Sequence, residues 1–327
     1  MPRWLRLLGK WALTAALGAA LWFTVDVAAV SEALHGARWS WIGLALLLLP
    51  LNVALDGWVW SRLLRRGAGP FPTRQLGAAL LCGFTLGIWT PARLGEYAGR
   101  AFCLPDADPW TVSLSVFAQR MIDMLVGVAA GLLALLGAVQ AGWIPLSAAW
   151  QAAAATGAVT AAGLGAAVLC PGRTAAWVAP LARWVPGLSS RISYFRQLRP
   201  RDGLPALAGT VLRYFVFTGQ FVCLTLALAP GLPPLSVFVA VALTFYAKYL
   251  IPSLTLLDLG IREGGAVLFF EIAGLPPAVG LSAALLLFVI NVLLPAAAGL
   301  PFIWRLSLPR RRSRPDPSPP GSVLAET

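Results

Sequence analysis

Residues 75–104 read QLGAALLCGFTLGIWTPARLGEYAGRAFCL. This stretch consists of an apolar piece at 75–89, a polar break at 90–96 and a second apolar piece at 97–104. A helix needs about 20 apolar residues to cross the hydrocarbon core of a bilayer, and the second piece is far too short for a crossing. We therefore predict a re-entrant helical hairpin whose broken tip reaches toward the middle of the membrane.

The composition of the whole chain places this stretch in a membrane. Of its 327 residues, 58% are hydrophobic and only 12% are charged, and the mean hydropathy is +0.76. Soluble domains contain about 25% charged residues, so this composition excludes a cytosolic enzyme, a disordered protein and a nucleic-acid-binding module. The net charge of +12 comes mainly from arginines in short connections and at both ends, as the positive-inside rule predicts.

Six apolar runs are long enough to cross the membrane as helices. Basic connections alternate with connections of little charge, which predicts a cell-membrane protein with both termini in the cytoplasm. Trp58 and Trp60 fall near a predicted span end, where indoles favour the interface. We expect one membrane domain at 1–306 and a disordered, basic and proline-rich cytoplasmic tail at 307–327. The predicted spans are 11–30, 40–60, 111–139, 151–170, 206–229 and 279–304.

A second segment, 237–278, is broken in the same way. Its apolar pieces at 237–251 and 264–274 flank a polar break from Pro252 to Glu263. The loop charges make this segment start and end outside, whereas the first hairpin starts and ends inside. Opposed re-entrant hairpins are typical of an inverted repeat, so the predicted fold is all-α, with about six full spans and two such hairpins. Two full crossings of 237–278 are the alternative.

The sequence lacks the common signatures of catalysis and metal binding. It has one histidine and four widely spaced cysteines, with no C-x-x-C, no H-E-x-x-H and no phosphate-binding loop. We therefore expect no enzyme activity, no cofactor, no metal site and no disulfide framework. We also expect no nucleic-acid partner.

Charges inside the apolar regions are the informative residues. A charge at the centre of a membrane helix costs roughly 2.5–3.5 kcal/mol on insertion scales. Such side chains must face each other, a wet cavity or a ligand rather than lipid. The candidates are Arg93, Glu96, Arg100, Arg120, Asp123, Lys248, Asp258, Arg262 and Glu263.

The first hairpin carries three of these charges at i, i+3 and i+7, which share one face if a helix begins near Pro91. Thr90 would cap this helix, and the free N–H groups at its start would favour a phosphate. Arg93 would add a bidentate contact to that phosphate. Glu96 would orient Arg93 or Arg100, or carry a proton. The alternative is a buried cluster of structural ion pairs without a ligand.

The remaining charges have a local interpretation and a functional one. Arg120 and Asp123 form an internal ion pair, or Arg120 reaches the cavity of the first hairpin. Asp258 and Arg262 can pair at i, i+4. Lys248 has no acidic neighbour in the sequence, so it is the better candidate to meet a ligand or the glutamate of the first hairpin. Helix breaks are predicted at Thr90, Pro91, Gly95, Pro252 and Gly260, and inter-helix hydrogen bonds at Asn52 and Asn291.

The motif TPARLGE at 90–96, followed by Arg100, resembles the first signature of the lysylphosphatidylglycerol synthase transmembrane family, also called the flippase-like domain family. QRMID at 119–123 is similar to the family's E-R-x-x-D, with glutamine in the first place. The resemblance covers roughly residues 10–305. Its late signature is matched by Pro252, Gly260 and Glu263, although Leu257-Asp258 replaces the usual glycine pair.

This resemblance implies lipid movement or lipid handling, with membrane lipids or a lipid-linked substrate as partners. Members with a soluble aminoacyltransferase domain make an aminoacylated phospholipid and move it to the outer leaflet, and we expect no such domain in a chain that ends at Thr327. We expect a translocase for a lipid with an anionic headgroup. The alternatives are a transporter of a small soluble anion and a non-transporting accessory protein in lipid or glycolipid biosynthesis. The predicted substrate-binding residues are Arg93, Glu96, Arg100, Arg120, Asp123, Lys248, Arg262 and Glu263.

Overall fold

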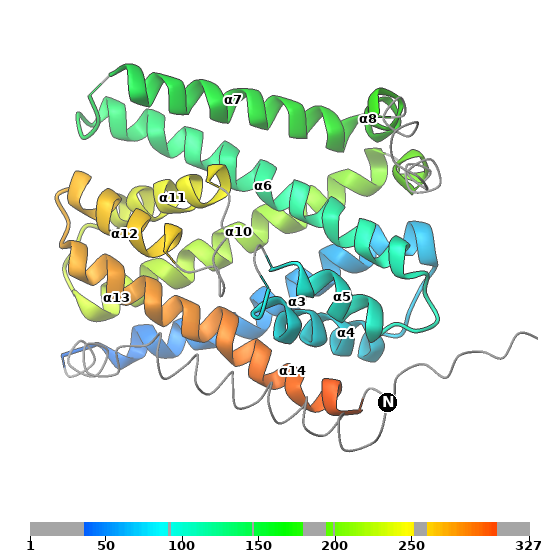
Figure 1. Cartoon of the computed structure of the whole chain (residues 1–327). Coiled ribbons are helices and arrows are strands. Elements are labelled where there is room, and N and C mark those ends of the chain that lie inside the picture. Colours follow the sequence, from blue (N-terminus) through cyan, green and yellow to red (C-terminus); the bar gives the residue numbers. More distant parts are fainter. Residues whose placement is uncertain are drawn as a thin grey trace, which may run out of the picture.

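The computed structural model describes residues 36–90, 93–145, 147–178, 194–198, 200–251 and 260–305. Helices dominate these ranges and no strand occurs in them, which confirms the predicted all-α fold (Figure 1). The helices of the first half are α3 (Trp39–Ala68), α4 (Thr73–Gly87), α5 (Gly95–Phe102), α6 (Pro109–Gln140), α7 (Ala148–Leu169) and α8 (Pro171–Val178). Those of the second half are α10 (Pro200–Leu228), α11 (Pro234–Leu250), α12 (Ile261–Ile272), α13 (Pro277–Phe288), the π-helical turn η4 (Val289–Leu293) and α14 (Leu294–Arg305).

Five helical stretches in the described part of the chain are long and apolar enough to cross a membrane. They are α3, α6, α7, most of α10, and the continuous run formed by α13, η4 and α14. Each overlaps one of the predicted spans from 40–60 onward, so the protein is a multi-pass membrane protein. The predicted first span at 11–30 and the predicted tail at 307–327 lie outside the described residues.

Both broken segments fold as pairs of short helices. In the first, α4 and α5 pack against each other, and α4 is followed by a turn at 88–90. In the second, α11 and α12 pack against each other, and Gly260 precedes α12 with a φ of 111° that favours glycine. Pro91 and Pro252, two of the predicted break residues, lie outside the described residues.

The packing of the hairpins relates the two halves of the chain. The first hairpin packs through α4 on α14, which ends the second half of the chain. The second hairpin packs through α11 on α6, which belongs to the first half. At the centre, α3 packs on α10, and these two helices are the spans that precede the first and the second hairpin (Figure 1). The same order of span, hairpin and span therefore occurs twice with reciprocal contacts, as an inverted repeat requires.

Close approaches at glycines make these contacts tight. A Cβ atom at Gly131 would lie 2.3 Å from the ring of Tyr246, and one at Gly127 would lie 2.0 Å from the ring of Tyr249. Two glycines on α6 thus receive two tyrosines of α11. At Gly299 on α14, a Cβ atom would lie 2.2 Å from a backbone oxygen of α4. Small residues allow membrane helices to approach this closely.

Two expectations from the sequence are wrong. Trp60 was placed near a membrane interface, but α3 continues to Ala68, and Trp60 is fully buried and donates a hydrogen bond to the Ser115 hydroxyl at 2.9 Å. No disulfide was expected, but Cys82 and Cys103 form one. Sequence spacing gave no sign of it, because it is the turn of the hairpin that brings α4 and the end of α5 together.

Candidate functional site

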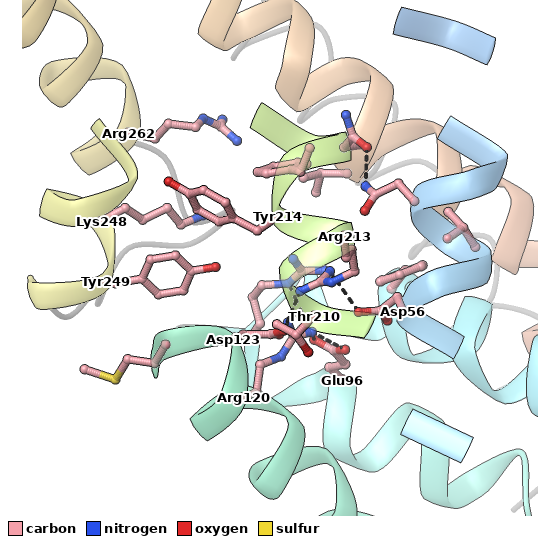
Figure 2. A pocket seen from close by; sticks show the side chains of 18 of the residues that line it. Asp56, Glu96, Arg120, Asp123, Thr210, Arg213, Tyr214, Lys248, Tyr249 and Arg262 are labelled. Atoms are coloured by element: carbon pink, nitrogen blue, oxygen red, sulfur yellow. Dashed lines mark hydrogen bonds and ion pairs between the residues drawn. The ribbon is translucent and has the colours of Figure 1, made fainter. Parts of the chain in front are cut away.

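A cavity of about 480 Å³ lies between the two hairpins and the middle parts of the long helices. Figure 2 shows side chains from α3, α6, α10, α11 and α12 that point into it. This volume is within the range of roughly 300–1,000 Å³ that is typical of ligand pockets. Its lining residues are Asn52, Val53, Asp56, Phe84, Arg93, Glu96, Tyr97, Arg120, Met121, Asp123, Met124, Thr210, Arg213, Tyr214, Phe217, Lys248, Tyr249, Ile251, Arg262, Asn291 and Val292.

One wall of the cavity is built on a closed ring of six alternating charges. The ring begins on the first hairpin, where Glu96 of α5 pairs with Arg100, one helical turn further along the same helix. Both oxygens of Glu96 also accept hydrogen bonds from Arg120 of α6, at 2.5 and 2.6 Å. Glu96 therefore orients two arginines and joins α5 to α6.

The ring continues through the two central helices. The second Nη of Arg120 lies 2.9 Å from Asp123, whose other carboxylate oxygen lies 2.7 Å from Arg213 of α10. Arg213 also contacts Asp56 of α3 at 2.9 Å, and Asp56 closes the ring with Arg100 at 3.0 Å. Three carboxylates and three guanidiniums thus connect four helices with no net charge.

Further contacts hold the buried side of the ring. Arg100 is completely buried and donates a hydrogen bond to the side-chain oxygen of Gln119 at 3.0 Å. The Cζ atom of Arg100 lies 4.7 Å from the centroid of the Trp60 ring. The amide nitrogen of Gln119 donates to Asp56 at 3.0 Å. Gln119, the first residue of the QRMID motif, therefore hydrogen-bonds to both an arginine and an aspartate of the ring.

The tip of the first hairpin differs from the prediction. The helix begins at Gly95, not near Pro91. The Thr90 hydroxyl accepts the Gly95 N–H at 2.5 Å, so Thr90 caps the helix from this more distant position. Arg93 precedes the helix with a φ of 56°, a conformation uncommon for a residue with a side chain. It therefore does not share a helical face with Glu96 and Arg100, although its Nε is 3.8 Å from Glu96.

The opposite wall of the cavity comes from the second hairpin. In Figure 2, Lys248 and Tyr249 of α11 and Arg262 of α12 extend into the cavity opposite Arg213 and Arg120. Arg262 pairs with the adjacent Glu263, and Asp258, its predicted partner, lies outside the described residues. Glu263 also accepts the N–H of Gly260 at 2.8 Å and so caps α12.

The structure brings most of the predicted site residues together. Those that line the common cavity are Arg93, Glu96, Arg120, Asp123, Lys248 and Arg262. Arg100 and Glu263 do not line it and instead support residues that do. Inter-helix hydrogen bonds were predicted at Asn52 and at Asn291, and the structure confirms them by joining the two side chains to each other at 2.7 Å. This bond links α3 to η4 at the edge of the cavity.

Sequence reasoning missed two central members of the site. Arg213 was not selected, and Asp56 was not included among the predicted binding residues, yet each contributes two contacts to the ring. The signal was present in both cases, because each is a charge inside an apolar run. The tyrosines Tyr214 and Tyr249 carry no comparable signal, since aromatic residues are common in membrane helices.

The described helices define a multi-pass membrane protein with a charged cavity between its spans. A family model described as the lysylphosphatidylglycerol synthase TM region matches residues 9–299. The chain therefore belongs to this lipid-related family, as the motifs at 90–96 and 119–123 predicted. A comparison with curated proteins found no match.

Proposed function

We propose that this protein moves a lipid with an anionic headgroup between the leaflets of the cell membrane, with the headgroup in the cavity and the acyl chains in the bilayer. The supporting observation is the cavity itself, where arginines and a lysine from both halves of the chain face one another midway along the membrane helices. In this proposal the protein carries out no covalent reaction.

The charges of the cavity suit a phosphate group. A headgroup crosses a bilayer slowly because its charge must leave water, and a polar cavity replaces part of the lost hydration. Arg120 and Arg213 offer guanidiniums that are each held in place by carboxylates of the ring. Guanidiniums held in this way can donate their remaining N–H groups to phosphate oxygens without first being ordered by the ligand.

Apolar side chains beside the charged walls provide a place for the acyl chains. Met121 and Met124 of α6 and Ile251 at the end of α11 line the cavity and are partly or well exposed. A lipid bound at the ring could therefore leave its tails along this apolar border. A small soluble anion would need no such border, and for this reason the lipid is favoured.

The two hairpins suggest how the cavity opens in turn to each leaflet. From the basic connections we expect the first hairpin on the cytoplasmic side together with both termini, and the second hairpin on the opposite side. Movement of one set of helices against the other around a fixed site is typical of inverted-repeat transporters. The reciprocal contacts of α4 with α14 and of α11 with α6 are the surfaces along which we expect this movement.

The test uses purified protein in phosphatidylcholine vesicles that contain a fluorescent phospholipid and a membrane-impermeant quencher outside. We expect faster loss of inner-leaflet fluorescence than in empty vesicles for an anionic phospholipid. Arg120→Gln should slow this loss, whereas Arg74→Gln, at an exposed position at the start of α4, should not. Rates equal to those of empty vesicles across a panel of anionic lipids would contradict the proposal. Uptake of labelled phosphate without lipid movement would instead indicate a transporter of soluble anions.

A further inference from the structure

Building on the proposed function, we propose that the cavity selects a lipid whose headgroup ends in a dianionic phosphate, as in a phosphomonoester or diphosphate lipid, and that it rejects a cationic aminoacylated headgroup. This selectivity follows from how the charges of the cavity are distributed between buried and accessible positions.

The carboxylates of the ring are not available to a ligand. The side chains of Asp56, Glu96 and Asp123 are exposed to only 2%, 1% and 3%, respectively. Each has both of its oxygens engaged by guanidiniums of the ring, as described above. An ammonium group of a bound headgroup would therefore find no accessible carboxylate among these three.

The guanidiniums are the accessible part of the same ring. Arg120 is 28% exposed and Arg213 is 18% exposed, and both line the cavity. Arg93, next to the ring, is 25% exposed and also lines it. The ring is neutral as a whole, but it presents its positive groups to the cavity and buries its negative ones. A ligand at this wall consequently meets a cationic surface.

The opposite wall adds positive charge. Lys248 comes from the second hairpin, and the hydroxyl groups of Tyr214 and Tyr249 provide neutral donors on the same side of the cavity. Arg262 also lines this wall, but it is only 2% exposed and is paired with Glu263. Among the lining residues that the structure describes, five are basic and three are acidic, which gives a net charge of +2. A headgroup with two negative charges would balance this excess, whereas a cationic headgroup would add to it.

The positions of the cations also favour a terminal phosphate over a bridging one. Basic groups approach from both walls, and a phosphomonoester offers three oxygens and a charge of about −1.5 to −2 at pH 7. A phosphodiester such as phosphatidylglycerol has only two non-bridging oxygens and a single charge. The cavity can therefore engage a monoester from more directions than a diester.

The experiment uses the same vesicles with four labelled lipids: phosphatidic acid, phosphatidylglycerol, phosphatidylcholine and lysylphosphatidylglycerol. We expect phosphatidic acid to move about tenfold faster than phosphatidylglycerol, a difference of about 1.4 kcal/mol. Phosphatidylcholine and lysylphosphatidylglycerol should move at the rate of empty vesicles. The ratio of phosphatidic acid to phosphatidylglycerol should rise from pH 5.5 to 7.5, because only the monoester gains a second charge near pH 6.

Variants test whether the second hairpin supplies the extra charge. Lys248→Gln should reduce the ratio of phosphatidic acid to phosphatidylglycerol severalfold, Lys248→Arg should restore it, and Arg74→Gln should leave it unchanged. Because these are ratios within one preparation, partial loss of folded protein does not change them. Inorganic phosphate in excess should slow the movement of phosphatidic acid, because the phosphate competes for the same cationic groups. Labelled phosphate should not accumulate in the vesicles.

The outcomes separate this inference from the proposed function. If the lipids move equally fast, or lysylphosphatidylglycerol moves fastest, the charge selectivity is wrong while lipid translocation stands. If no lipid moves faster than in empty vesicles, the proposed function and the inference both fail. Accumulation of labelled phosphate inside the vesicles would overturn the lipid as the source of the dianion.

Discussion

Glu96 and Arg120 are joined through both carboxylate oxygens, at 2.5 and 2.6 Å, although one residue belongs to the short helix α5 of the first hairpin and the other to the long helix α6. Glu96 is almost completely buried, whereas Arg120 reaches the cavity. The pair therefore fixes the hairpin tip to α6 and at the same time presents a guanidinium to a ligand. The stability of the fold and the proposed binding of a headgroup therefore depend on the same contact between Glu96 and Arg120.

Replacement of Glu96 should consequently destabilise the protein. Glu96→Gln leaves Arg100 and Arg120 without one of their counter-ions in a buried place, and breaking a buried ion pair costs about 3–5 kcal/mol. We expect a clear drop in the thermal unfolding midpoint of the detergent-solubilised protein, measured by tryptophan fluorescence. Glu271→Gln, at an exposed position at the end of α12, is the matched control. An unchanged midpoint for Glu96→Gln would refute the structural role of the ring.

The ring should also couple residues that are far apart in the sequence. Asp56 and Arg213 lie on α3 and α10, and their side chains are 2.9 Å apart. In a double-mutant cycle of Asp56→Asn and Arg213→Gln, we expect an interaction energy of about 0.5–3 kcal/mol in the free energy of unfolding. Asp56→Asn combined with Arg74→Gln should be additive. Additivity in both cycles would mean that the ring does not act as one unit.

The contact between α6 and the second hairpin provides a third prediction. Gly131→Leu would force a side chain into the ring of Tyr246, which lies 2.3 Å from where a Cβ atom would be. Overpacking of this kind costs typically about 1–3 kcal/mol, so the unfolding midpoint should fall.

Gly137 on the same helix is the control for this prediction, because no atom lies within 4 Å of a Cβ atom built there. Gly137→Ala should leave the unfolding midpoint unchanged or raise it, since alanine favours helix over glycine by roughly 0.5–1 kcal/mol. Equal effects of the two substitutions would show that Tyr246 does not pack on α6 as described.

The fold could be predicted from the sequence because hydrophobic length and loop charge are local properties. The span at 111–139 needed only a count of apolar residues, and α6 occupies it almost to the residue. The hairpin at 75–104 followed from a polar break between pieces too short to cross. The disulfide between Cys82 and Cys103 did not follow, because it depends on the angle and register with which α4 and α5 pack.

The candidate site could be predicted only in part. Unusual charges such as Arg93 and Arg120 are visible in an apolar sequence, but their partners are not. Pairing at i, i+3 correctly joined Arg120 to Asp123, whereas the contacts of Glu96 with Arg120 and of Arg213 with Asp56 connect separate helices. Such contacts depend on how the halves of the chain pack, which no local pattern specifies.

A cysteine in the cavity tests most directly whether lipid passes through it. Cys82 and Cys103 are joined and Cys223 is buried, so Cys170→Ser removes the exposed thiol in the described part of the chain. In this background, Tyr249→Cys places a thiol in the cavity, and Arg74→Cys places one at an exposed position at the start of α4. Both variants are reconstituted and treated with a bulky anionic thiol reagent.

The measurement is the rate of phosphatidic acid movement before and after this treatment, with mass spectrometry to confirm modification. We predict that modification of Tyr249→Cys reduces the rate to that of empty vesicles and that modification of Arg74→Cys has no effect. Excess phosphatidic acid should slow the reaction at position 249. Undiminished lipid movement in fully modified Tyr249→Cys protein would contradict passage of the headgroup through this cavity.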